Sequence, residues 1–282
     1  MVLSRLGADV RRALLIPVVC MQTIAANLGS MLTPIGNPQN LYLYGKSGMS
    51  IGGFVLLMLP YTLVSLLLLL AWAALVCRKA SDALSVDELV SSSASQGDQK
   101  IILLYLVLFA VCLLSVIRVL PYGIAFAAVL VCALFADPHT LQAVDYSLLL
   151  TFVAFFIFIG NLGRIPAFSG WLQEFLTGRE VLVAVLASQV TSNVPAALLL
   201  SGFTAETQAL IIGTNLGGLG TLIASMASLI SYRQIARELP QGKKQYFGLF
   251  TLSNLVFLAL LLGVWFSVSY THLRAHETDS YL

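Results

Sequence analysis

Long uncharged stretches constrain the fold of this chain more than any other feature. They cover residues 13–45, 47–77, 101–117, 119–136, 147–163, 181–205, 207–232 and 245–273. About 20 apolar residues are needed to cross the hydrocarbon core of a bilayer as a helix. Only 10% of the residues are charged, against about 25% in soluble domains. The sequence therefore predicts an all-α polytopic membrane protein.

Composition also excludes several classes of function. The net charge is +2, and no dense basic stripe is present, so we expect no nucleic-acid partner. The four cysteines and three histidines show no metal-ligand spacing, and the motifs of serine hydrolases (GxSxG) and zinc proteases (HExxH) are absent. We therefore expect no enzyme and no cofactor, apart from a sodium ion that the transport reaction described below would use.

The uncharged stretch at 181–205 is interrupted by polar residues. Ser192, Asn193 and Pro195 stand at its middle and leave two pieces, each too short to cross a bilayer. This pattern predicts a re-entrant helical hairpin over 180–203. With the N-terminus cytoplasmic, the inside segments hold ten Lys and Arg and the outside segments four; a full span here would give six and eight. Because Lys and Arg accumulate on the cytoplasmic side, the count favours the hairpin.

These signals divide the chain into four regions. We expect the end of a first repeat at 1–77, a Ser-rich acidic cytoplasmic linker at 78–100, a second repeat at 101–268, and at 269–282 a tail that resembles translated adapter sequence. In the first repeat we predict a broken helix at 13–45 and a span at 53–77. In the second we predict spans at 101–117, 121–136 and 147–163, the hairpin at 180–203, a broken helix at 206–232 and a span at 246–268.

A short motif occurs twice, in two helices of opposite predicted direction. Asn27 to Thr33 aligns with Asn215 to Thr221 at an offset of 188 residues (215 − 27 = 188), with Asn, Leu, Gly and Thr identical. Two similar units of opposite orientation are typical of inverted-repeat secondary transporters. The same offset places a first hairpin tip near position 5, so we expect the first hairpin to lie outside this chain.

Both copies of the motif adjoin sequence that disfavours a continuous helix. Pro34 and Pro38 lack amide donors, so the first helix must open there. Opened backbone within a bilayer persists only where protein buries it or where it lines a wet cavity. Half-helix N-termini then attract an anion, and freed carbonyl groups can coordinate a small cation. Alternatively, Gly213 and Gly217 form a GxxxG pattern that packs helices.

Together these motifs resemble the ion transporter superfamily, over about residues 10–268. The resemblance rests on Ala26 to Gly29 with Thr33 to Leu41, on Thr191 to Ala196, and on Asn215 to Gly218. The superfamily includes divalent-anion:sodium symporters, citrate carriers, arsenite permeases and some sodium/proton antiporters. The resemblance implies a homodimeric protein with a scaffold domain and with substrate bound between hairpin tips. Val194 stands where the Ser-Asn-Thr signature of dicarboxylate carriers has threonine, which leaves the substrate open.

The resemblance implies alternating-access transport of a di- or tricarboxylate, sulfate or arsenite across the inner (plasma) membrane, coupled to sodium or protons. A sodium/proton antiporter and a non-transporting membrane scaffold remain as alternatives. Sodium is expected at Asn193 and Asn215. The full set of expected binding residues is Thr33, Gly36, Asn37, Asn40, Ser192, Asn193, Thr214, Asn215, Gly217 and Thr221.

Overall fold

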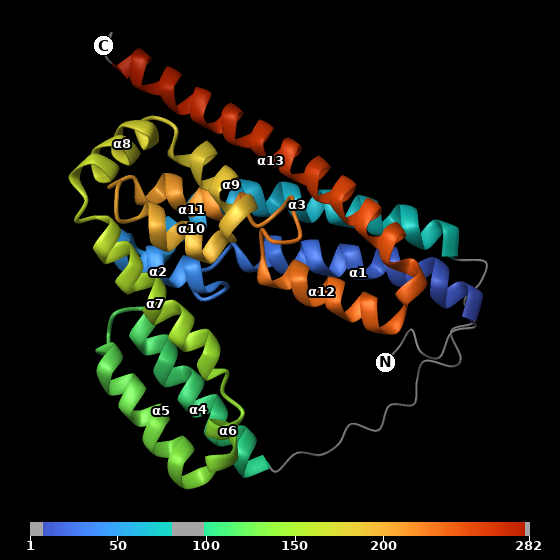
Figure 1. Ribbon diagram of the computed structural model, residues 1–282, viewed down its shortest axis with the longest axis horizontal. Helices are drawn as coiled ribbons and strands as arrows, with labels where there is room; N and C mark the ends of the chain where they lie inside the picture. The colour runs from blue at the N-terminus through green and yellow to red at the C-terminus, as the bar shows by residue number, and fades with distance from the viewer. Residues whose placement is uncertain (1–7, 81–98, 280–282) are drawn as a thin grey trace. The chain divides into compact units, whose positions relative to one another are not determined.

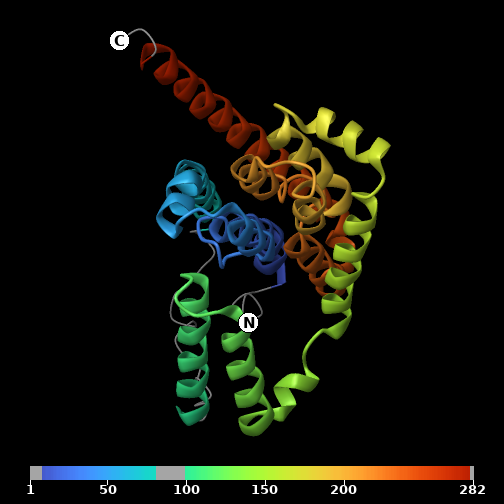
Figure 2. The same cartoon turned by 90° about the vertical axis from the view of Figure 1, so that its left-hand side faces the viewer.

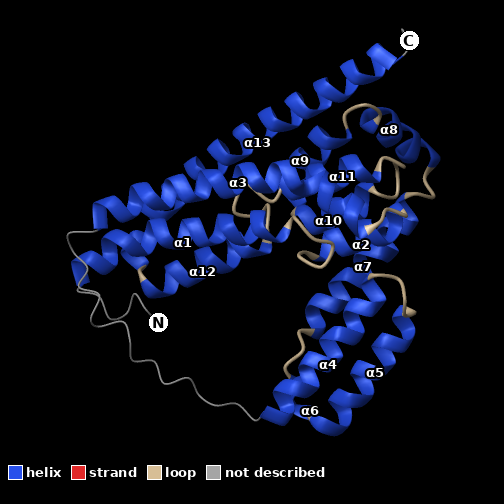
Figure 3. Cartoon of the chain, turned by 180° about the vertical axis from the view of Figure 1, so that it is seen from behind, coloured by secondary structure: helices blue, strands red, loops and turns tan. Residues whose placement is uncertain are grey.

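The computed structural model describes residues 8–80 and 99–279. Within these ranges the chain is helical and contains no strand (Figure 3), which confirms the predicted all-α class. Most of the predicted linker at 78–100 lies outside the described residues.

The helices in the first part of the chain are α1 (Ala8–Ser30), α2 (Pro38–Ser47), α3 (Ile51–Ala80), α4 (Gln99–Val116), α5 (Tyr122–Ala136), α6 (Pro138–Gln142) and α7 (Tyr146–Leu162) (Figure 1). Those in the second part are α8 (Pro166–Leu176), α9 (Glu180–Thr191), α10 (Asn193–Leu200), α11 (Thr207–Leu216), α12 (Met226–Glu238) and α13 (Lys243–Asp279), with a short 3₁₀ turn, η4 (Pro240–Gly242), before α13. Proline stands at the first helical position of α6 and α8, where its fixed φ favours helix initiation. The sequence did not lead us to expect these two short helices.

Several helices have the length and apolarity of membrane spans. Within the described residues, three helical segments are long and apolar enough to cross a membrane: Ile51–Arg78, Gln99–Val116 and Pro240–Ser269. Leu56 and Leu67 of α3 remain 69% and 66% exposed to their surroundings. Large apolar surfaces of this kind are costly in water and suit contact with lipid. The chain is thus an integral membrane protein.

Contacts divide the chain into two compact units, Asp87–Phe158 and the remainder. In the smaller unit, α4 packs against α5 and α5 against α6. The hydroxyl groups of Thr140 and Tyr105 donate hydrogen bonds to the Asp137 carboxylate at 2.7 and 2.8 Å. These two bonds hold the pKa of Asp137 below its ordinary value.

The larger unit contains a bundle in which α1 lies beside α3, α12 and α13 (Figures 1 and 2). Its core includes Ile16 and Cys20 of α1, Ile235 of α12, and Tyr246 and Phe250 of α13. The rings of Tyr246 and Phe250 stack at 5.6 Å between centroids. This bundle supports one side of the region where the chain leaves helical geometry.

The same unit contains a second group of shorter helices, α2, α9, α10 and α11. Here α9 packs against α10 and α11, and α2 packs against α10 and α11. Only Ser192 separates α9, of 12 residues, from α10, of 8. At 1.5 Å per residue they are about 18 and 12 Å long, so neither alone crosses a core of about 30 Å.

Candidate functional site

The first break in a helix lies between Ser30, the last residue of α1, and Pro38, the first of α2. Asn40 compensates for the lost helical bonds: its Nδ2 donates to the carbonyl oxygens of Ser30, Met31 and Thr33 at 3.3–3.5 Å. Gly36 lies so close to Ser30 that a Cβ at this position would overlap the Ser30 carbonyl. The break therefore has a defined geometry that requires glycine at position 36.

The second break lies between Leu216, the last residue of α11, and Met226, the first of α12. The prediction that both helices are broken is thus confirmed. Gly213 and Gly217 face α9, where added Cβ atoms would come within 2.7 Å of the Cβ atoms of Ala184 and Ser188. The GxxxG pattern therefore packs α11 closely against α9, as the packing alternative proposed, and Gly217 contributes to the break through its carbonyl group.

The residues that precede the second half-helix of each break have the same backbone conformation and are related by the offset of the repeated motif. Asn37 precedes α2 with φ −141° and ψ 149°, and Ser225 precedes α12 with φ −143° and ψ 151°. The two residues are 188 positions apart (225 − 37 = 188), the offset that also relates Asn27 to Asn215. The motif alignment therefore extends from sequence into backbone conformation.

Hydrogen bonds join the two breaks reciprocally. Asn27 on α1 donates from Nδ2 to Ser225 Oγ at 2.9 Å, at the start of α12. Its counterpart Asn215 on α11 accepts at Oδ1 from Asn37 Nδ2 at 3.5 Å, at the start of α2. Because each asparagine contacts the residue that begins the half-helix of the other repeat, the contacts have the pattern of a two-fold relation between the breaks.

Asn215 also bonds directly to the first repeat. Its Nδ2 donates to Asn40 Oδ1 at 2.6 Å and to the carbonyl of Ile211 at 2.8 Å. Asn40 and Asn215 are 0% and 2% exposed. Both amide hydrogens of Asn215 are therefore used within the protein, and only its Oδ1, with one long contact, retains capacity to bind a ligand.

The tip of the hairpin reaches the second break. Ser192 adopts φ +76° between α9 and α10, and the backbone N–H of Asn193 donates to the Ala224 carbonyl at 3.0 Å. The Asn193 side chain lies against Gly218, whose Cβ position is 3.0 Å from Asn193 Nδ2. This side chain is 7% exposed and makes no hydrogen bond to any described residue. It is a buried amide available to a ligand.

Half-helix ends of both polarities surround this region. The N-termini of α2, α10 and α12 point to the breaks or the hairpin tip, and no side chain caps α2 or α10. The C-termini of α1, α9 and α11 lie at the same points. Helix N-termini carry partial positive and C-termini partial negative charge. Residues 31–40, 188–200 and 211–230 contain no titratable side chain, so these segments contribute dipoles and no formal charge to the local potential.

Gln39 is a residue of this region that the sequence-based site did not include. It is 1% exposed in the first turn of α2, and its Nε2 has no hydrogen-bond partner among the described residues. An unpaired buried donor costs about 1–3 kcal/mol and therefore needs an explanation. The available signal was its place in the sequence, directly after Pro38 and between the two expected site residues Asn37 and Asn40.

The expected threonines differ in what they contact. Thr214 is fully buried and its hydroxyl donates to the Leu210 carbonyl at 2.7 Å, within α11. Thr33 contributes its carbonyl, which accepts from Gly36 N at 3.1 Å. Thr221 is bound to Gln189 of α9. The structure thus brings Thr33 and Thr221 to the breaks and leaves the Thr214 hydroxyl engaged inside a helix.

The far end of α10 is fastened to α2. Lys46 Nζ donates to the Ser201 carbonyl, and Tyr42 Oη lies 3.0 Å from Ser201 Oγ. Desolvation at this contact lowers the pKa of Lys46. Helices α2 and α10 therefore run in the same direction, with their N-termini at the breaks.

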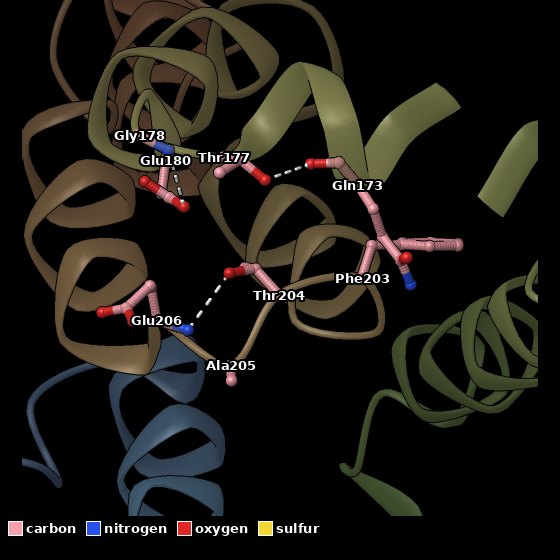
Figure 4. A pocket seen from close by; sticks show the side chains of 8 residues that line it. All are labelled: Gln173, Thr177, Gly178, Glu180, Phe203, Thr204, Ala205 and Glu206. Atoms are coloured by element: carbon pink, nitrogen blue, oxygen red, sulfur yellow. Dashed lines mark hydrogen bonds between the residues drawn. The ribbon is translucent and has the colours of Figure 1, made fainter. Parts of the chain in front are cut away.

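A separate pocket of about 560 Å³ lies at the opposite end of the hairpin (Figure 4). Its lining includes two carboxylates, Glu180 and Glu206, and Glu180 accepts a hydrogen bond from the Gly178 N–H at 3.1 Å. None of the expected site residues lines it. The remaining lining residues are Gln173, Thr177, Gly178, Phe203, Thr204 and Ala205.

Two broken helices related by one sequence offset, with a short hairpin at the second break, have the arrangement that is typical of inverted-repeat secondary transporters. Comparison with known proteins gives the family. Residues 2–209 match the citrate transporter family, and the chain belongs to it.

Two curated relatives are similar to the chain. It is 34% identical to inner membrane protein YbiR of Escherichia coli (strain K12), over 81% of this chain and 62% of YbiR. It is 32% identical to the uncharacterized transporter MJ0456 of Methanocaldococcus jannaschii, over 77% of this chain and 57% of that protein. The chain thus spans about three fifths of the length of these relatives. The family is one of transporters and not of enzymes, in agreement with the sequence-based prediction.

Proposed function

We propose that the protein is a secondary active transporter that carries an anion, with a di- or tricarboxylate as the leading class, together with a cation. The observation that carries this proposal is the meeting of uncapped half-helix N-termini with buried, unpaired amides at the paired breaks. The family match to citrate transporters supports the carboxylate class. Sulfate and arsenite are the other candidates.

Anion recognition would rest on neutral groups. Asn193 and Gln39 offer side-chain N–H donors in the first turns of α10 and α2. Helix N-termini bind carboxylate and phosphate groups through free backbone N–H groups and the helix dipole. Because these donors carry no formal charge, they attract an anion without holding it as tightly as an arginine would, and release on the other side remains possible.

A cation bound beside the anion would offset its charge. Asn215 Oδ1 and the carbonyl oxygens released at the breaks are neutral oxygen ligands of the kind that suits sodium. The breaks and the hairpin tip contain no titratable side chain, which favours a metal cation over a proton as the coupling ion. Sodium/proton antiport on the same scaffold is the second candidate function.

Uptake of radiolabelled citrate into proteoliposomes tests the proposal. We expect uptake that depends on an inward sodium gradient and falls at least about tenfold in Asn193→Ala, because this buried amide is a proposed anion donor and makes no hydrogen bond to any described residue. Asn161→Ala, an exposed asparagine at the end of α7, is the matched control and should transport normally. Sodium flux driven by a pH gradient, without anion uptake, would instead establish the antiporter.

The orientation is a separate part of the proposal. The name of the Escherichia coli relative supports an inner-membrane location, and the Lys and Arg distribution supports a cytoplasmic linker. Single cysteines replacing Ser91 and Lys46 should react with impermeant maleimide from the cytoplasmic and external sides, respectively. Labelling of position 91 from outside would show that the protein has the opposite orientation in the membrane.

A further inference from the structure

Gln189 makes an unusual set of contacts with the second break. Its Nε2 donates to the carbonyl oxygens of Gly217 at 3.0 Å, Leu219 at 2.9 Å and Val185 at 3.1 Å. Its Oε1 accepts from the Thr221 N–H at 2.9 Å, and its own carbonyl accepts from Thr221 Oγ1 at 3.0 Å. One side chain on α9 thus satisfies backbone groups that unwinding of α11 leaves without helical partners.

These contacts show that successive residues of the second break direct their backbone polar groups toward opposite sides. Alternate residues, Gly217, Leu219 and Thr221, turn polar backbone groups toward Gln189. Gly218, between them, turns its carbonyl to Asn27 Nδ2 at 3.3 Å and lies against Asn193. One edge of the break is therefore fixed to α9, and the other faces the candidate binding site.

Close approach of Gln189 also requires a special backbone at Gly220. Gly220 has φ +110°, and a Cβ there would overlap Gln189 Oε1. Position 220 therefore needs a glycine, which adopts positive φ without strain and leaves room for the carboxamide to reach the Gly217 and Leu219 carbonyl groups and the Thr221 N–H. Sequence and backbone at position 220 are thus matched to Gln189.

We propose that Gln189 is a positioning residue: it holds the second break open in one geometry and joins it to the hairpin, so that both move as one body. This inference rests on the proposed function only for its consequence in transport. The fixed geometry itself can be measured without any substrate.

The Gln189 carboxamide has both a donor (Nε2) and an acceptor (Oε1), and substitutions that remove one or both give a specific chemical test. Gln189→Ala removes all side-chain bonds. Gln189→Glu keeps the shape, but an ionised carboxylate would meet the carbonyls of Gly217 and Leu219 with no hydrogen to donate, whereas a protonated carboxyl can donate one bond. Packed against α9 are α10 and α11, and neither Asn193–Leu200 nor Thr207–Leu216 contains a titratable group. Glu180 stands nine residues away, about 13–14 Å along α9.

Hydrogen exchange of the purified protein, followed by mass spectrometry, measures the geometry of the break. We expect exchange in peptides covering 217–221 to rise about tenfold or more in Gln189→Ala, since the Thr221 N–H loses its bond to Oε1 and the carbonyl groups of Gly217 and Leu219 lose the bonds that fix the break. In Gln189→Glu, exchange corrected for its intrinsic pH dependence should be fast at pH 8 and return toward wild type at pH 5. Gln208→Ala, exposed on α11, is the matched control and should leave the break unchanged.

Citrate uptake then measures the consequence. Gln189→Glu should recover activity as the pH falls, relative to wild type, while Gln189→Ala should stay inactive at both pH values. Wild-type exchange at 217–221 in Gln189→Ala, or a Gln189→Glu protein whose exchange does not respond to pH, would overturn the proposal. Absence of citrate uptake by the wild type, with the exchange results as expected, would overturn the proposed function alone.

Discussion

The hydrogen bond between Asn40 and Asn215 should be measurable as an energetic coupling between the two repeats. We consider Asn40→Ala, Asn215→Ala and the double variant. The bond is 2.6 Å long and both side chains are buried. Each single change leaves the other residue with an unpaired buried group, which costs about 1–3 kcal/mol. Truncation also removes packing, so each single variant should lose about 2–4 kcal/mol of unfolding free energy.

The double variant should lose less than the sum of the two single losses, because the bond can be broken only once. Couplings between membrane helices average about 0.6 kcal/mol and reach about 1.7. The short distance and complete burial place this pair near the upper end, at about 1–1.7 kcal/mol.

Equilibrium unfolding in mixed detergent micelles, followed by fluorescence of the three tryptophans, gives the four free energies of this cycle. Asn161→Ala should change the unfolding free energy by less than about 0.5 kcal/mol. Single-variant losses that add within about 0.3 kcal/mol would show that the repeats are not joined by this bond.

Three further outcomes follow from particular contacts. Gly36→Ala should lower thermal stability sharply, because its Cβ would overlap the Ser30 carbonyl, while Gly45→Ala, with open space around it, should not. Tyr105→Phe should raise the pKa of Asp137, measured by NMR titration, since a hydrogen bond to the ionised carboxylate is lost; an unchanged pKa would contradict this contact. Asn193→Ala should leave thermal stability within a few degrees of wild type, because its side chain has no bond in the protein to lose, and a large drop would show a structural role.

The sequence predicted the all-α class, both breaks and the meeting of the motif copies. These features have local causes. Pro34 and Pro38 remove helical donors at positions that any fold must accommodate, and the glycine-rich stretch from Gly217 to Gly220 has low helix propensity. The repeat of Asn27 at Asn215 then placed one break beside the other.

The same reasoning did not include Gln189 or Gln39, and its expectation of a ligand role for Thr214 stays a prediction. A glutamine on an apolar helix has no signature of its own; Gln189 matters because α11 unwinds 28 residues later at Gly217. Thr214 stands next to Asn215 in sequence, but successive helical residues point about 100° apart, and its hydroxyl returns to Leu210. Which neighbour a polar group meets is decided by tertiary packing.

The reciprocal bonds at the breaks also have a consequence for biosynthesis. Asn27 finds its partner Ser225 198 residues later in the chain. At translation rates of about 5–20 residues per second, that partner is synthesised about 10–40 s after Asn27. The opened backbone after α1 is bonded by Asn40 of the first repeat, but throughout that interval the Asn27 side chain lacks Ser225 and the Asn40 side chain lacks Asn215. During insertion into the bilayer these two side-chain amides must therefore bond to water or to other groups until the second repeat arrives.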